Sequence, residues 1–153
     1  MSAAIPAVAL RRKLNAPVDR VFGAFAQADL VSRWLTPSPE IKLTVLDFDF
    51  RVGGSYRFAY LTPDGTRMLV GGSYRAIEPP RKLVFSWLIE PPDPHAGIES
   101  LVTITLIPSG SGTELTIRHE NWGRADANAR HDEGWNGAVD RLTELLAGEE
   151  TKS

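Results

Sequence analysis

The stretch that decides the fold is Asp126–Ala147, DANARHDEGWNGAVDRLTELLA. Its apolar residues recur at steps of three and four: Trp135, Ala138, Val139, Leu142, Leu145 and Leu146. This spacing predicts a helix with one apolar stripe that must be buried. Asp126 suits the N-cap position, and Gly148 suits the end of the helix. At a rise of 1.5 Å per residue the helix would be about 30 Å long, which is the width of a small domain.

Outside this helix, almost everything between residues 40 and 121 alternates in the manner of β-strands. The strands are expected near residues 8–14, 41–50, 55–61, 68–77, 83–89, 101–107 and 114–121, with two short helices between the first and second of them. Short turns connect the later strands, so neighbouring strands should run antiparallel. The order of strand, two helices, six strands and one long helix predicts an α+β fold.

Several breaks in the strand pattern predict bends or turns. The apolar parity changes between Ile41 and Phe50, which predicts either a β-bulge there or a section buried on both faces. Gly71-Gly72 lies inside a strand, where glycine usually marks a bend or a close approach of another backbone. Pro63-Asp64-Gly65 predicts a hairpin turn. The segment from Glu90 to Gly97 is rich in proline and predicts a protruding loop.

Composition bounds the function. The 153 residues fit one domain, residues 1–153, with a core over about residues 7–148. A net charge of −2 predicts neither nucleic acid nor an anionic membrane as a partner. No apolar run reaches the roughly 20 residues of a membrane span. The absence of cysteine excludes disulfides and thiol catalysis, and it favours a cytoplasmic protein.

Short motifs follow one another in an order typical of a known superfamily. They are Arg12 with Asn15–Pro17, Val21–Phe22, Trp34–Leu35, Asp49–Gly54, Gly72–Tyr74, Pro79–Phe85, Gly112–Thr116, His119 and His131–Trp135. The D-x-R-x-G-G and H-x-x-G-W stretches among them are the most specific. The chain resembles stand-alone bacterial members of the SRPBCC (START-like, helix-grip) superfamily. It is most similar to the branch related to the C-terminal domain of the heat-shock ATPase activator.

The resemblance implies a seven-stranded curved antiparallel sheet wrapped around the long C-terminal helix, with a cavity between them. Superfamily members bind lipids, sterols, polyketides or hormones in that cavity, and a minority are cyclases, aromatases or hydrolases. A likeness of this kind specifies the fold more tightly than the activity.

The leading functional hypothesis is therefore the binding of a small, largely apolar ligand that is lipid-like, aromatic or polyketide-like. The candidate ligand-binding residues are Arg12, Trp34, Tyr56, Phe58, Tyr60, Trp87, His119 and Trp135. Arg12, Tyr60 and His119 would supply the polar groups that fix the orientation of the ligand. Trp34 and the loop from Glu90 to Gly97 would lie near the mouth of the cavity.

Each of these residues also has a structural interpretation. The aromatic side chains, with Phe85 and Trp122 among them, could be core. His119 could be a buried histidine that ties the last strand to the long helix. Arg12 lies on an apolar face, so it needs a partner, such as Glu120 or Glu133.

The sequence is also compatible with functions other than ligand binding. An enzyme of the cyclase, dehydratase or hydrolase type could use His119 as an acid or base in the same cavity. The chain could instead contact a chaperone ATPase, or form a homodimer through Leu69, Leu88 or Leu101 on the outer sheet face. No metal site is expected, because His119 and Glu120 point to opposite faces of one strand. No phosphate loop or dinucleotide fingerprint is present, so no cofactor is expected.

Overall fold

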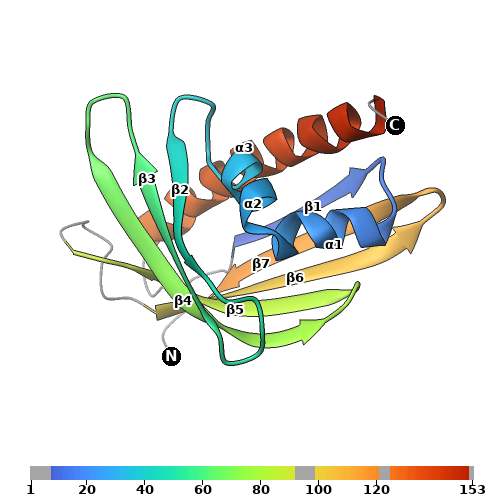
Figure 1. The fold of residues 1–153 in the computed structure, drawn as a ribbon, viewed down its shortest axis with the longest axis horizontal. Coiled ribbons are helices and arrows are strands. Elements are labelled where there is room, and N and C mark those ends of the chain that lie inside the picture. Colours follow the sequence, from blue (N-terminus) through green and yellow to red (C-terminus); the bar gives the residue numbers. More distant parts are fainter. Residues whose placement is uncertain (1–7, 92–98, 121–124, 152–153) are drawn as a thin grey trace.

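The computed structural model describes residues 8–91, 99–120 and 125–151, and these ranges contain the predicted order of elements (Figure 1). In chain order the elements are β1 (Val8–Leu14), α1 (Val18–Ala26), α2 (Ala28–Trp34), β2 (Lys42–Phe48), β3 (Ser55–Leu61), β4 (Arg67–Glu78), β5 (Lys82–Ile89), β6 (Glu99–Ser109), β7 (Gly112–Glu120) and α3 (Ala125–Thr151). The part of the predicted protruding loop at residues 92–98 lies outside the described residues, as does Trp122.

The seven strands form one antiparallel sheet in the order β1-β7-β6-β5-β4-β3-β2. Only the β1–β7 ladder joins strands that are distant in sequence. Figure 1 shows the sheet curving, with the three helices gathered against its hollow side. The α+β class, the curved sheet and the long C-terminal helix are therefore confirmed. Within the described ranges no helix combines the length and apolar character needed to cross a membrane.

Two irregularities bend the sheet where the sequence predicted them. The β2–β3 register shifts between Val45 and Asp47, which is the predicted bulge. In β4, a Cβ atom on Gly72 would lie 2.0 Å from the carbonyl oxygen of Ser86. No side chain fits at that distance, so this glycine lets β4 and β5 approach closely. The close approach at Gly72 joins β4 and β5, which together with β3 carry one wall of the cavity described below.

The long helix α3 buries the stripe predicted for it. Trp135, Ala138, Val139, Leu142 and Leu146 are buried, and Leu145 is half-buried against the same core. The predicted ends of the helix were wrong. Asp126 lies inside the first turn because the helix begins at Ala125, and Gly148 lies inside the helix because it continues to Thr151. A glycine costs a helix only about 1 kcal/mol, so it does not have to end one.

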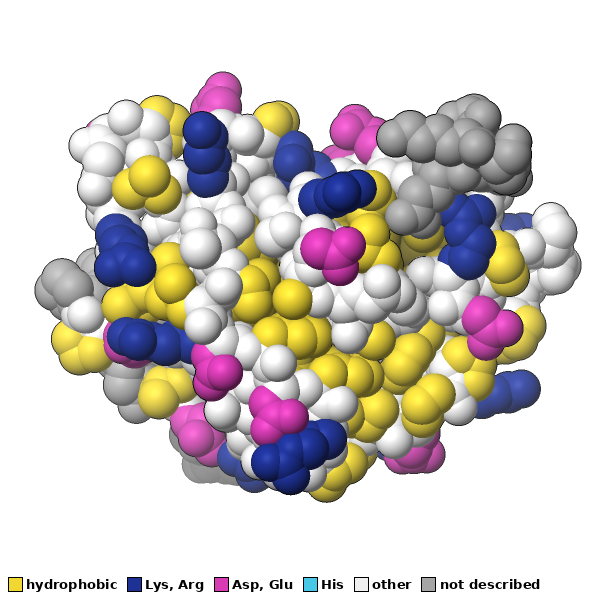
Figure 2. Space-filling model, viewed as in Figure 1, with side chains coloured by type: hydrophobic (Ala, Val, Ile, Leu, Met, Phe, Trp, Pro, Cys, Tyr) yellow, Lys and Arg dark blue, Asp and Glu magenta, His cyan; other side chains and the backbone are white. Residues whose placement is uncertain are grey.

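A continuous row of aromatic rings runs through part of the core between the sheet and the helices. It is called the aromatic row here and consists of Tyr60, Phe58, Tyr56, Tyr74, Phe50 and Phe22. Successive ring centroids lie 4.7 to 6.5 Å apart, which is the range of favourable aromatic pairs. Figure 2 shows apolar side chains reaching the surface on this face, with charges of both signs interspersed among them.

The aromatic row contains all three tyrosines of the chain, and this gives a test by alkaline titration. Burial raises the pKa of Tyr60 and of Tyr74. The pKa of Tyr56 is raised by burial first and then by Tyr60 and Tyr74. An unfolded tyrosine ionises near pH 10. The stability contributed by neutral tyrosines is thus complete below about pH 10 and is lost as the pH rises further.

We therefore expect no tyrosinate while the protein is folded. In a pH titration, the ultraviolet absorbance of tyrosinate should rise only together with the loss of circular dichroism. The denatured protein is the control, and its tyrosines should titrate near pH 10. A tyrosine that ionises near pH 10 in the folded protein would contradict the burial of the aromatic row.

Candidate ligand-binding pocket

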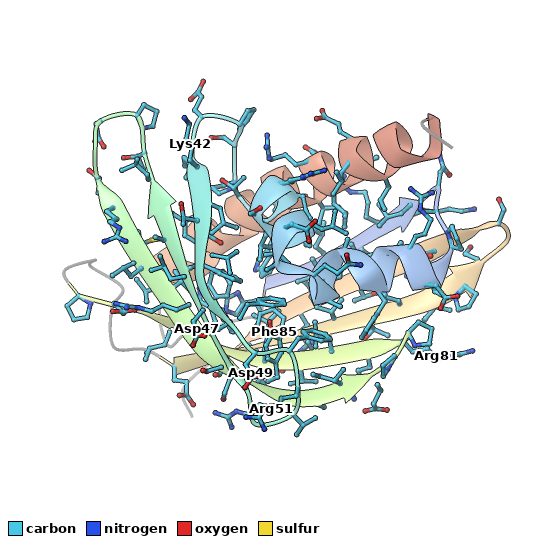
Figure 3. The ribbon with its side chains drawn as sticks, in the orientation of Figure 1. Lys42, Asp47, Asp49, Arg51, Arg81 and Phe85 are labelled. Atoms are coloured by element: carbon cyan, nitrogen blue, oxygen red, sulfur yellow. The ribbon has the colours of Figure 1, made fainter. Side chains whose placement is uncertain are left out.

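A pocket of about 430 Å³ lies between α3, the strands β3 to β5 and the segment 35–41 that connects α2 to β2. Figure 3 labels Lys42, the first residue of β2, where this segment ends. The described residues that line the pocket are Leu35, Thr36, Pro37, Ser38, Ile41, Tyr60, Thr62, Thr66, Met68, Trp87, Gly134, Trp135 and Ala138. The lining is thus mostly apolar or aromatic, with hydroxyl groups from the connecting segment and from the β3–β4 turn.

Two tryptophans form an aromatic corner in this lining. Trp87 comes from β5 and Trp135 from α3, and their ring centroids lie 5.8 Å apart at an interplanar angle of 49°. Strand alternation turns Trp87 inward together with Phe85 and Ile89, which are also buried. The helical stripe turns Trp135 towards the sheet. The aromatic corner therefore joins the sheet to the helix at the pocket.

A hydrogen-bond chain behind the aromatic corner holds both tryptophans. The indole Nε1–H of Trp135 donates to Nδ1 of His119 at 3.0 Å. Nε2 of His119 lies 2.7 Å from Oγ of Ser100, and that hydroxyl donates to the carbonyl oxygen of Trp87 at 3.0 Å. Since Nδ1 accepts, the fully buried imidazole is neutral and carries its proton on Nε2. His119 thus ties β7 to α3, as its structural interpretation predicted.

The connecting segment 35–41 is fixed against both walls of the pocket. The hydroxyl of Tyr60 donates to the carbonyl oxygen of Leu35 at 2.9 Å, and that of Thr36 donates to the carbonyl oxygen of Ile41 at 2.7 Å. On the helix side, a Cβ on Gly137 would lie 2.0 Å from the carbonyl oxygen of Pro37. The segment can rest on α3 at this distance only because residue 137 is glycine.

The β3–β4 turn contributes Thr62 and Thr66, two residues that carry hydroxyl groups, to the lining of the pocket. The Asp64 carboxylate accepts hydrogen bonds from the Thr62 hydroxyl and from the backbone N–H of Thr66 at 2.9 Å. These bonds, that of Thr62 foremost, lower the pKa of Asp64 to about 2. The carboxylate is therefore charged at neutral pH and holds both threonines of the turn in place.

Three of the eight candidate ligand-binding residues line the pocket, namely Tyr60, Trp87 and Trp135. Tyr56 and Phe58 belong to the aromatic row instead. Trp34 is fully buried and donates its indole N–H to the carbonyl oxygen of Ala24 at 2.9 Å, so its neighbour Leu35 takes the place at the pocket. Direct contact with a ligand stays a prediction for all eight candidates.

The two charged or titratable candidates are engaged with the protein. His119 lies behind the aromatic corner, as described. The guanidinium of Arg12 donates to the carboxylate of Asp140 at 2.7 Å and to the amide oxygen of Asn136 at 3.3 Å. Its side chain is 30% exposed, so the pair lies at the surface rather than in the core. Of the two partners suggested from sequence, Glu120 pairs with Arg118 instead, and the side chain of Glu133 lies outside the described residues.

Sequence reasoning missed most of the remaining lining. In the connecting segment, Pro37 and Pro39 indicate only that a helix cannot continue there, and they carry no signal for a pocket. One available signal was the pair Gly134 and Gly137, three residues apart on α3. Such spacing places both glycines on one helix face and permits a close backbone approach there. Among the described residues, no group of three histidine, aspartate or glutamate side chains could hold a metal ion.

Solved structures of other proteins resemble the chain over most of its length. Protein CV1439 from Chromobacterium violaceum is 29% identical over 92% of this chain and 96% of its own, with a TM-score of 0.84. A protein from Rhodobacter sphaeroides is 25% identical over 97% of both chains, with a TM-score of 0.80. The AHSA1 protein from Silicibacter pomeroyi is 23% identical over 94% of this chain and 99% of its own, with a TM-score of 0.82.

None of the curated proteins compared with the chain matches it. A family model does match, over residues 15–147, and it spans nearly every element described above. The chain therefore belongs to the family described as Activator of Hsp90 ATPase homolog 1-like protein.

Proposed function

We propose that this protein binds a small, largely apolar ligand, of lipid-like, aromatic or polyketide-like character, in the pocket between α3 and the sheet. The observation that carries the proposal is the pocket itself, with its volume of about 430 Å³ and its mainly apolar and aromatic lining. Ligand pockets of proteins typically have volumes of about 300–1,000 Å³ and this kind of lining. We also infer a cytoplasmic location from the absence of cysteine.

Affinity would come mainly from the burial of apolar surface, at about 25 cal/mol per Å². Residues on both walls contribute this surface: Ile41 and Leu35 from the connecting segment, Met68 from β4 and Ala138 from α3. The segment 35–41 is already fixed in place, so little ordering of the protein should be needed on binding.

Native mass spectrometry of freshly purified protein tests the proposal. We expect a stoichiometric small molecule that is released on denaturation and can then be identified. In the variant Ala138→Leu, the larger side chain occupies part of the pocket, so the bound species should be lost or reduced about tenfold or more. Ala147→Leu is the matched control, because Ala147 is exposed on the same helix. Equal loading of both variants would mean that the molecule is bound elsewhere.

Contact with a chaperone ATPase is the second candidate, and the family description is the observation that favours it. The test is a pull-down with the chaperone ATPase of the host as bait. Retention that is unaffected by Ala138→Leu would support a contact surface separate from the pocket. No retention would leave the ligand-binding proposal as the better account.

The geometry does not favour acid–base catalysis by His119. Both of its ring nitrogens are hydrogen-bonded to protein groups, and it lies behind Trp135 rather than on the pocket lining. A general base must reach the proton that it abstracts, directly or through one water molecule.

A further inference from the structure

We propose that His119 is an acid-sensitive latch between β7 and α3: a proton taken up on its Nδ1 atom in mild acid breaks the hydrogen bond from Trp135 and loosens α3 from the sheet. This is a conformational property of the fold, and it does not depend on the proposed ligand-binding function. Its consequence is that the wall of the pocket formed by α3 is fixed at neutral pH and released below about pH 6.

The first support is that every hydrogen bond around His119 has a fixed direction. The indole N–H of Trp135 can only donate, so Nδ1 of His119 must accept at 3.0 Å. The hydroxyl of Ser100 donates its proton to the carbonyl oxygen of Trp87, so it accepts from Nε2 of His119 at 2.7 Å. Only one neutral tautomer of the imidazole satisfies this whole chain.

The second support is that the protonated imidazole does not fit this arrangement. A proton on Nδ1 would face the indole N–H of Trp135, and neither of these two donors can accept from the other. No rotation of a hydroxyl and no change of tautomer restores the bond, because both ring nitrogens of a protonated histidine are donors. His119 therefore takes up a proton only if Trp135 gives up its acceptor. Trp135 is buried, so its freed N–H must move to reach water or another acceptor.

The surroundings of the fully buried imidazole come from four elements. The described groups that face it are uncharged, namely Val8 of β1, Trp87 of β5, Ser100 and Val102 of β6, and Trp135 of α3. On β7 itself, Arg118 and Glu120 point to the opposite face of the sheet and pair with each other at 3.4 Å. Earlier on α3, the side chains that lie outside the described residues include those of His131, Asp132 and Glu133. Of these three, His131 titrates in the same pH range as His119, so it requires a control.

The latch should make the stability of the protein depend on pH with a defined sign. A histidine in the unfolded chain takes up a proton below about pH 6.5, whereas the folded protein must break the latch to do so. The unfolded state thus binds more protons than the folded state in mild acid, and stability falls as the pH falls. One such group raises the equilibrium constant for unfolding by up to about tenfold for each pH unit below that value.

NMR spectra of the indole N–H groups between about pH 7 and about pH 5 follow the latch directly in the full chain. We expect the signal of Trp135, identified by its loss in Trp135→Phe, to shift or broaden over this range while the protein stays folded. The signal should stay constant in His119→Gln, because the glutamine amide can accept from the indole N–H and donate to Ser100 but takes up no proton. His131→Gln is the matched control, and it should keep the wild-type response.

Unfolding in denaturant at the two ends of this pH range is the second readout. The acid-induced rise in the equilibrium constant for unfolding should be about tenfold larger in the wild-type protein than in His119→Gln. A Trp135 signal that does not change with pH would overturn the proposal, and so would a response that is lost in His131→Gln. If His119→Gln does not fold, the wild-type spectra and the His131→Gln control still decide between these outcomes. None of them bears on the ligand-binding proposal, which native mass spectrometry tests at neutral pH.

Discussion

Replacement of Gly137 by alanine is expected to lower the free energy of unfolding by about 1–3 kcal/mol and to weaken ligand binding. The new Cβ would lie 2.0 Å from the carbonyl oxygen of Pro37 and 3.0 Å from its carbonyl carbon. These are backbone atoms, so no change of rotamer relieves the clash. Either α3 or the segment 35–41 must move, and each forms one wall of the pocket.

The same substitution at Gly134 provides the matched control. Its Cβ would meet only the Cβ of Pro37, at 3.8 Å, which is an ordinary contact. Alanine is favoured over glycine in a helix by about 1 kcal/mol, so Gly134→Ala should stabilise the protein by up to that amount. Unfolding in denaturant measures both changes. Equal stability of the two variants would show that Pro37 does not press on α3.

The fold was largely predictable because its determinants are periodic or local. The stripe of α3 follows the helical period, and the strands follow an alternation of two. Even the bulge at Val45 and the close approach at Gly72 had signals, a change of parity and a glycine inside a strand. The ends of α3 were predicted wrongly because Asp126 and Gly148 are residue types that suit cap positions, whereas in the structure both lie inside the helix.

The pocket was only partly predictable, for a physical reason. Alternation tells which side chains point inward, and it placed Tyr56, Phe58 and Tyr60 together on one face of β3. It does not tell which of them meet other side chains and which line a cavity. That difference depends on where the segment 35–41 crosses the sheet and α3, which is a long-range packing outcome. The partner of Arg12 was missed for the same reason, because Asp140 is 128 positions away.

Replacement of His119 by leucine is expected to cost about 2–4 kcal/mol of stability, although the two side chains are of similar size. The imidazole is fully buried, and its loss leaves the indole N–H of Trp135 without its acceptor and removes the bond to Ser100. A buried donor without an acceptor costs more than the bond itself contributes. The aromatic corner would also lose the support that orients it, so ligand binding in the pocket should weaken beyond the effect on stability.

A double-mutant cycle with Trp135→Phe separates the hydrogen bond from general loss of packing. Phenylalanine keeps an aromatic ring but has no donor, so the double variant contains no unsatisfied indole. Its destabilisation should be smaller than the sum of the two single effects by about 1–2 kcal/mol. Additive effects would instead mean that His119 and Trp135 contribute independently as packed side chains. In that case the orientation of the aromatic corner would come from packing alone.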